Sequence, residues 1–303
     1  MLTRFAPAPT GYLHLGHVVN AIYVWGVARA RAAEVLLRVE DHDRQRCRPE
    51  YEAALLDDLD WLGFVPDRFP TQAFRRGACE SRQSERHVVY DEAARRLAER
   101  GLLYACRCSR QEIATAQASG GGDEFRYPGT CRDRGWPLAP DVAWRVRLEP
   151  GEEGFDDLLC GYVGQDPAAQ CGDVVIRDRL GNWTYQFVAS VDDHAQGVDL
   201  VVRGRDLLAS TGRQIRLARL LGRHEPARFA HHALVMKSAA QKLSKSDGDT
   251  GVRDLGARGW TAERVIGEAV RLAGLGPGGP LSADDAARLL SGPLQLNLTE
   301  RRS

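Results

Sequence analysis

Short apolar segments alternate with amphipathic helical segments along most of this chain of 303 residues. The run VLLRVED at residues 35–41 begins with consecutive apolar side chains, as is typical of a strand buried in a parallel sheet. The helix predicted at 49–63 starts at a proline and ends at a glycine, the residues that helices favour at those positions. Alternating strands and helices favour parallel strands joined by helical crossovers. The sequence therefore predicts an α/β fold with a doubly wound parallel sheet.

The remaining segments extend this pattern, with one interruption. Further strands are predicted at 2–5, 102–108, 142–148, 173–178, 198–204 and 229–236, and further helices at 84–101, 210–222, 261–274 and 282–291. The tract 114–140 is instead rich in glycine, proline and charge. This change of composition indicates an excursion from the main sheet.

The composition excludes several classes of protein. Basic and acidic side chains balance at 41 each, so a strongly basic nucleic-acid binder is not indicated. The N-terminus lacks the basic and apolar segments of a signal peptide, and no run of about 18 apolar residues predicts a membrane span. The seven cysteines are then expected to be reduced thiols, some of them metal-bound. These features predict a cytoplasmic protein.

The most informative short stretch is RFAPAPTGYLHLGH at residues 4–17. It is predicted to form a loop between a strand and a helix N-terminus, where backbone N–H groups and the helix dipole favour a bound phosphate. His14 and His17 would add hydrogen-bond donors, and Gly16 would permit close approach of a large ligand. Taken alone, the two histidines could equally be ordinary polar residues at a helix start or, less specifically, metal ligands.

A second motif is KLSKS at residues 242–246. The chain otherwise favours arginine, so Lys242 and Lys245 indicate a need for compact point charges that can follow a migrating phosphate charge. Taken alone, a solvated basic loop is the more ordinary interpretation.

Together, HLGH and KLSKS resemble the paired signatures of class I aminoacyl-tRNA synthetases. The segments RFAPAPTGYLHLGH, LLRVEDHD, PEYEAALLDDLDWLG, WTYQFVASVDDHAQGVDLVVRGRDLL and KLSKS resemble, in order and spacing, the glutamyl-tRNA synthetase catalytic domain over residues 2–250. The resemblance implies a ligase in which the carboxylate of L-glutamate attacks the α-phosphate of ATP, giving glutamyl-adenylate and pyrophosphate. It also implies a Rossmann-type catalytic domain at 1–105 and 173–250, interrupted by a zinc-containing, acceptor-like subdomain at 106–172 and followed by a short helical region at 251–303.

The resemblance also assigns the nucleotide-binding residues. His14, Gly16 and His17 would hold the phosphates of ATP, which would enter with Mg²⁺. Lys245 would bind ATP and stabilise the departing pyrophosphate, and Lys242 would support the same loop. The expected catalytic residues are therefore the two histidines and the two lysines.

Residues for L-glutamate follow from the same resemblance. The strand that lies along the amino acid is matched by Arg4, Phe5, Ala6, Pro7 and Ala8. Glu40 would pair with the α-ammonium group, and Tyr185 and Arg203 match the remaining positions, with Arg203 as the fork for the side-chain carboxylate. Without the family, Glu40 would be interpreted as a solvated or capping carboxylate and Arg203 as part of a surface ion pair.

Three cysteines of the expected insertion have metal-type spacing. Cys106 and Cys108 form a CxC pair, and Cys131 ends the motif YPGTC. Zinc favours four tetrahedral ligands, so three cysteines fall one short, and three metal-free thiols are the alternative. The pattern resembles the zinc site of a short paralogue of the glutamyl-tRNA synthetases, which implies that Tyr127 is the fourth ligand of one structural Zn²⁺.

The region after KLSKS agrees with the short paralogue. Only 57 residues follow Ser246, so no anticodon-binding domain is expected. The resemblance implies activation of glutamate without tRNA, followed by its transfer to the cyclopentenediol of queuosine in the anticodon of tRNA(Asp). It implies no membrane partner, and we expect a monomer.

Three alternatives remain open. The chain could be a glutamyl-tRNA synthetase catalytic fragment that charges the 3′ end of a tRNA. It could be a non-catalytic tRNA-binding or regulatory protein, although such a protein has no need for both HLGH and KLSKS. It could also be a general nucleotidyltransferase, a reading that Glu40, Tyr185 and Arg203 together disfavour.

Overall fold

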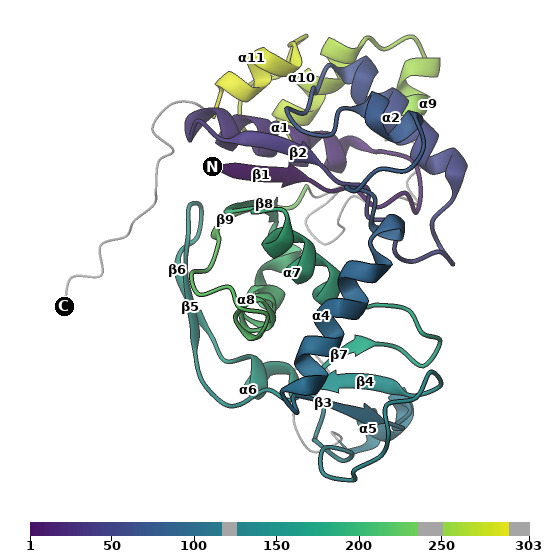
Figure 1. The fold of residues 1–303 in the computed structure, drawn as a ribbon. Coiled ribbons are helices and arrows are strands. Elements are labelled where there is room, and N and C mark those ends of the chain that lie inside the picture. Colours follow the sequence, from purple (N-terminus) through teal and green to yellow (C-terminus); the bar gives the residue numbers. More distant parts are fainter. Residues whose placement is uncertain (117–125, 236–250, 291–303) are drawn as a thin grey trace, which may run out of the picture.

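The computed structural model describes residues 1–116, 126–235 and 251–290, which form three hydrogen-bonded sheets with helices packed around them (Figure 1). The strands are β1 (Leu2–Phe5), β2 (Glu34–Leu37), β3 (Leu103–Cys106), β4 (Ala143–Val146), β5 (Glu153–Asp157), β6 (Gly161–Gln165), β7 (Val174–Arg177), β8 (Leu200–Gly204) and β9 (Arg228–His232). The helices are α1 (Leu15–Ala30), α2 (Pro49–Leu62), α3 (Thr71–Arg75), α4 (His87–Glu99), α5 (Arg110–Ala116), α6 (Pro167–Cys171), α7 (Tyr185–Ala195), α8 (Thr211–Leu220), α9 (Val252–Ala257), α10 (Ala262–Leu272) and α11 (Ala283–Arg288).

Two parallel crossovers form the frame of the molecule. Strand β1 leads through α1 to β2, which pairs with β1 in parallel, and β8 leads through α8 to β9 in the same way. The two units meet where the backbone N–H of Asp199 donates to the carbonyl oxygen of Leu2 at 3.0 Å. The predicted α/β fold with parallel strands is confirmed in these units.

The strands do not form the single doubly wound sheet that the sequence predicts. The order β6-β5-β9-β8 includes an antiparallel β5–β6 hairpin, and β3, β4 and β7 form a separate antiparallel sheet. The segments EGFDD and GYVGQ, which form β5 and β6, lack the apolar run that predicts a buried strand. In the antiparallel sheet, β3 and β7 come from either side of the expected insertion and pair with β4 inside it.

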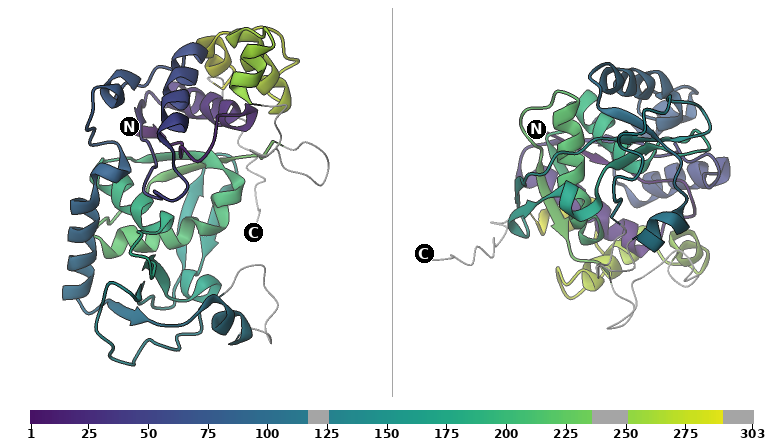
Figure 2. Two further views of the ribbon diagram at one scale, coloured as in Figure 1. Left: turned by 90° about the vertical axis from the view of Figure 1, so that its right-hand side faces the viewer. Right: turned by 90° about the horizontal axis from the view of Figure 1, so that it is seen from below.

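Helices cover the frame and connect its two ends. Helices α10 and α11, which were predicted, pack against α1, where a Cβ on Gly26 would lie only 2.7 Å from Leu290. Helix α4 contacts both α7 and β3, and so connects α7 to the antiparallel sheet (Figure 2). In the part of the chain that the structure describes, no helix has both the length and the apolar character needed to cross a membrane.

Candidate functional site

A cavity of about 630 Å³ opens beyond the carboxyl ends of β1, β2, β8 and β9, where α/β proteins bind their ligands. It brings together every predicted nucleotide and amino-acid residue of the described chain, namely Arg4, Phe5, Ala6, Pro7, Ala8, His14, Gly16, His17, Glu40, Tyr185 and Arg203. Lys242 and Lys245 lie outside the described residues. Residues as distant as 4 and 203 therefore share one ligand-sized space.

The start of α1 presents two imidazoles to this cavity. The Nδ1 atom of His14 accepts from the backbone N–H of Gly16 at 3.0 Å, and the Nδ1 atom of His17 accepts from that of His14 at 3.1 Å. Since both Nδ1 atoms are acceptors, the neutral rings carry their protons on Nε2. Gly16 is required here, because a Cβ would lie 2.8 Å from the His14 ring. The helix N-terminus thus combines its positive dipole end with two side-chain N–H groups.

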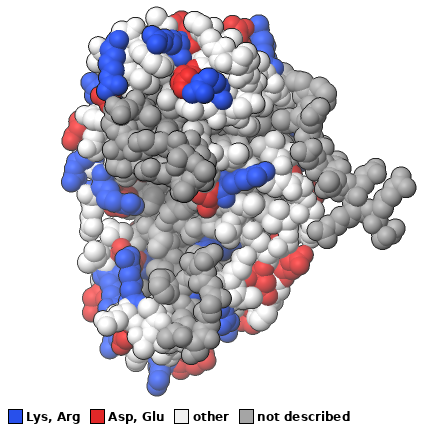
Figure 3. Space-filling model, turned by 180° about the vertical axis from the view of Figure 1, so that it is seen from behind, with Lys and Arg blue, Asp and Glu red and all other residues white. Residues whose placement is uncertain are grey.

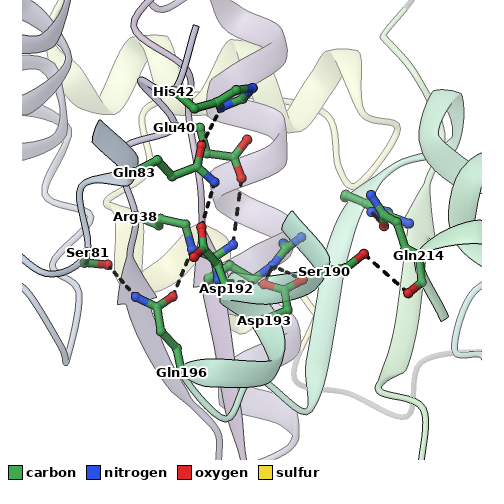
Figure 4. Close-up of polar contacts among 12 residues, drawn as sticks. Arg38, Glu40, His42, Ser81, Gln83, Ser190, Asp192, Asp193, Gln196 and Gln214 are labelled. Carbon is green, nitrogen blue, oxygen red and sulfur yellow. Dashed lines mark hydrogen bonds and ion pairs between the residues drawn. The ribbon is translucent and has the colours of Figure 1, made fainter. Parts of the chain in front are cut away.

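The floor of the cavity is a chain of alternating buried charges (Figure 4). Asp193 on α7 accepts from the Nε atom of Arg4 at 3.1 Å and from the Nη2 atom of Arg38 at 2.6 Å. The Nη1 atom of Arg38, whose side chain is fully buried, lies 3.8 Å from the Oε1 atom of Glu40. Arg4 and Glu40, from two different strands, are therefore held at fixed positions through Arg38 and Asp193.

A second arm of polar contacts fixes His42 at the cavity wall (Figure 4). The Nδ1 atom of His42 bonds to the Gln83 side-chain oxygen at 2.6 Å, and the Gln83 amide donates to Asp192 at 2.8 Å. Asp192 also accepts from Arg86 at 2.6 Å and from the Tyr90 hydroxyl at 2.9 Å. The sequence analysis missed these supporting residues, although two adjacent aspartates after the apolar run FVASV were a usable signal.

Glu40 has an unusual environment for a carboxylate. Burial raises its pKa to about 7, although the nearby guanidiniums of Arg38 and Arg4 act to lower it. The carboxylate therefore gains or loses its proton close to neutral pH.

Arg203 lies in the same cavity and is held by three side chains. Its Nε atom donates to His231 Nε2 at 3.0 Å, its Nη1 atom to Gln214 Oε1 at 2.6 Å and its Nη2 atom to Thr211 Oγ1 at 2.9 Å. Only 4% of Arg203 is exposed. The guanidinium has five N–H groups, and these three contacts use one on each nitrogen, so the remaining N–H groups on Nη1 and Nη2 face the Tyr185 hydroxyl and the space for a ligand.

The predicted zinc ligands form a second cluster, beside β3. The sulfurs of Cys106, Cys108 and Cys131 all lie within 4.8 Å of one another. The Tyr127 hydroxyl oxygen lies 3.5 Å from the sulfur of Cys106 and 3.9 Å from that of Cys108. The Arg145 guanidinium covers the Tyr127 ring at 3.6 Å from its centroid, and burial raises the pKa of this phenol. The structure thus brings together all four residues that the sequence analysis grouped.

The fold agrees with comparisons to known proteins. The family model for the catalytic domain of class I tRNA synthetases (E and Q) matches residues 1–281. A glutamyl-Q tRNA(Asp) synthetase from Rhodobacter capsulatus is 41% identical over 265 residues, covering 82% of this chain and 91% of that protein. A protein of the same name from Geobacter sulfurreducens is 40% identical over 296 residues, covering 96% of this chain and 90% of its own length.

A solved structure shows the same architecture. A glutamate tRNA ligase from Elizabethkingia meningosepticum, in complex with its amino acid, matches with a TM-score of 0.75 at 26% identity. The match covers 96% of this chain and 65% of that one. The chain therefore belongs to the glutamyl-Q tRNA(Asp) synthetases, ligases of the class I tRNA synthetase family.

Proposed function

We propose that this protein activates L-glutamate with ATP, without tRNA, and then transfers the glutamyl group to the cyclopentenediol of queuosine in the anticodon of tRNA(Asp). The observation that carries the proposal is the composition of the main cavity. Helix-terminal imidazoles that suit phosphate line the same space as two buried guanidiniums and one buried carboxylate. These charges complement the two carboxylates and the ammonium group of glutamate.

At the nucleotide end, the residues at the start of α1 would stabilise the phosphates. An α-carboxylate oxygen of glutamate attacks the α-phosphorus, a new P–O bond forms, and the bond to pyrophosphate breaks. The Nε2–H groups of His14 and His17 would donate to the phosphate oxygens as charge accumulates on them. Gly16 leaves room for the nucleotide, which would enter with Mg²⁺ as part of the substrate. Lys245 and Lys242 keep their proposed roles toward the leaving pyrophosphate.

At the amino-acid end, the charged floor would orient glutamate. Glu40 would pair with the α-ammonium group, Arg203 would bind the side-chain carboxylate, and Tyr185 would line the same pocket. Arg4 and the backbone from Phe5 to Ala8 would lie along the substrate. This positioning holds the attacking oxygen toward the α-phosphate, which is the main contribution a protein makes to such a transfer.

The raised pKa of Glu40 leads to a prediction about pH. The KM for glutamate should fall as the pH rises through about 7, because only the ionised Glu40 pairs with an ammonium group. The measurement is glutamate-dependent pyrophosphate exchange over this pH range. In Glu40→Gln the KM should be higher and nearly independent of pH. A wild-type KM that is constant with pH would contradict this role of Glu40.

We also propose that Cys106, Cys108, Cys131 and Tyr127 hold one structural Zn²⁺. The residues fit such an ion, because zinc–sulfur bonds of about 2.3 Å in a tetrahedron separate the sulfurs by roughly 3.8 Å. The observed separation of 3.3 Å between the sulfurs of Cys108 and Cys131 is close to this value. When bound, the ion would cross-link the end of β3 to the loop that carries Tyr127.

The zinc proposal predicts the metal content of the purified protein. Wild type should contain about one zinc per chain, and Cys131→Ser should lose most of it and unfold about 5 °C lower or more. Elemental analysis and thermal unfolding measure both quantities. Cys160→Ser, outside the cluster, is the control and should keep its zinc. Equal zinc in both variants would rule out this site.

The nucleotide that accepts the glutamyl group is a separate part of the proposal. It is supported by the names of the relatives, and the alternative is the charging of a tRNA 3′ end. On the face shown in Figure 3, basic and acidic side chains are interspersed, as expected from their equal numbers. The charge on this face therefore favours neither acceptor.

The activation step has a direct test that needs no tRNA. Wild-type protein should catalyse ATP–pyrophosphate exchange with L-glutamate and not with L-aspartate or L-glutamine. Exchange that requires tRNA, or that prefers another amino acid, would overturn this part of the proposal.

A further inference from the structure

Arg203 is a buried cation whose hydrogen-bond partners are all neutral groups. A buried guanidinium is ordinarily paired with a carboxylate, because an uncompensated charge is costly in the interior. Among the residues that the structure describes, none of the aspartates or glutamates forms an ion pair with Arg203. Its partners are His231, Gln214 and Thr211, together with the neutral Tyr185 hydroxyl on the cavity side. By contrast, Arg4 in the same cavity is paired with Asp193.

Asp157 fixes the tautomer of His231. Its Oδ2 atom lies 2.5 Å from His231 Nδ1, and because a carboxylate can only accept, the ring proton resides on Nδ1. The Nε2 atom is then left as the acceptor for Arg203. Burial lowers the pKa of His231, which keeps the ring from becoming a second cation beside the guanidinium.

Backbone N–H groups around Asp157 donate hydrogen bonds to its carboxylate. Its Oδ1 atom accepts from the backbone N–H groups of Leu159 and Cys160, both at 2.9 Å, and Oδ2 accepts from the backbone of His231 at 3.1 Å. The imidazole ring separates this carboxylate from Arg203. Asp157 therefore orients His231, which accepts from Arg203, without itself contacting the guanidinium.

Thr211 and Gln214, both on α8, are the other two side chains that accept from Arg203. The Thr211 hydroxyl donates to the Leu207 carbonyl oxygen at 3.2 Å, so its lone pairs face Arg203. Gln214 is buried, and its Oε1 atom accepts from Arg203, whereas its Nε2 atom has no hydrogen-bond partner among the described residues. Gln214 thus contributes a neutral acceptor at a position where glutamate would fit equally well.

We propose that His231, Gln214 and Thr211 form a neutral cage that orients Arg203 while leaving its charge uncompensated, so that the site selects a carboxylate over an amide in the substrate side chain. The inference rests on the proposed role of Arg203 in binding glutamate. A γ-carboxylate accepts from the N–H donors of Arg203 that these three side chains leave available and supplies the missing negative charge. A glutamine amide would place its own NH₂ against one of these donors and would leave the cation unpaired.

The variant that tests the cage is Gln214→Glu, which adds a negative charge with almost no change in shape. Its carboxylate would lie 2.6 Å from Arg203 and would stay ionised beside the guanidinium. Glutamate binding by calorimetry should weaken by about tenfold or more, and the preference for glutamate over glutamine should fall by a similar factor. Gln214→Met removes the acceptor without adding charge, so it should weaken binding less and keep the preference.

Controls separate the cage from the proposed function. Gln72→Glu, on the exposed face of α3, adds the same charge far from the cavity and should bind glutamate as wild type does. Thermal unfolding establishes that each variant is folded. If folded Gln214→Glu binds both amino acids like wild type, or if Gln214→Met loses the preference equally, the cage is wrong. A wild type that binds glutamate but shows no exchange refutes the proposed reaction alone, and one that binds no glutamate refutes both.

Discussion

Arg203→Gln should lower kcat/KM for glutamate in pyrophosphate exchange by about 10²- to 10⁴-fold, because loss of the buried partner of a substrate carboxylate costs about 3–5 kcal/mol. The fold should tolerate the change. In the free protein this guanidinium is a buried charge without a carboxylate partner, and its removal leaves only neutral acceptors behind. We therefore expect a midpoint of thermal unfolding no lower than that of wild type, as is common for residues kept for function.

The experiment pairs exchange kinetics with thermal unfolding. Arg95→Gln is the matched control, since Arg95 is exposed on α4 and contacts only glutamates of its own helix. It should leave exchange unchanged. Exchange by Arg203→Gln with a wild-type KM for glutamate would remove Arg203 from the binding site.

Asp193→Asn should have the largest effect on stability, about 3–5 kcal/mol in the free energy of unfolding. Burial alone would raise the pKa of Asp193, but Arg4 and Arg38 hold this pKa below its ordinary value. The aspartate is therefore ionised at neutral pH. An amide would remove the carboxylate that lies 2.6 Å from the fully buried Arg38 and would leave Asp192 and Glu40 as the nearby negative charges, with Glu40 at 3.8 Å. The KM for glutamate should rise as well, because Arg4 loses the contact that orients it.

Urea unfolding measures this loss of stability and compares it with the loss at an aspartate–arginine pair on the surface. Asp284→Asn is the control, because Asp284 is about half exposed where it pairs with Arg29, and such pairs contribute less than about 1 kcal/mol. Equal losses of stability in the two variants would show that the buried chain of charges does not support the floor of the cavity.

Local patterns indicated the candidate residues that are contiguous in the chain. His14, Gly16 and His17 lie within one loop and helix start, a position that suits a phosphate, and the KLSKS motif was needed to favour that interpretation. The spacing of Cys106, Cys108 and Cys131 likewise predicted a cluster. The family resemblance was needed for Glu40 and Arg203, which are separated by more than a hundred residues and which the fold brings into one cavity.

The supporting residues could not be predicted in this way. Asp193, Gln214 and His231 act only through partners on other elements, and each resembles an ordinary helix or strand residue in the sequence. Strands β5 and β6 were missed for a related reason. They are stabilised by pairing with each other and with β9 rather than by an apolar run of their own. These residues and strands depend on tertiary contacts, which the periodicity of a sequence does not indicate.

The acceptor is decided most directly by following labelled glutamate. Wild-type protein, ATP and radiolabelled glutamate would be incubated with tRNA(Asp) containing or lacking queuosine, and with tRNA(Glu). Our account predicts labelling of queuosine-containing tRNA(Asp) alone, persisting after removal of its 3′-terminal adenosine and mapping to the anticodon fragment after nuclease digestion. Labelling of tRNA(Glu) that disappears with its 3′-terminal adenosine would contradict the account and make the protein a 3′-charging synthetase.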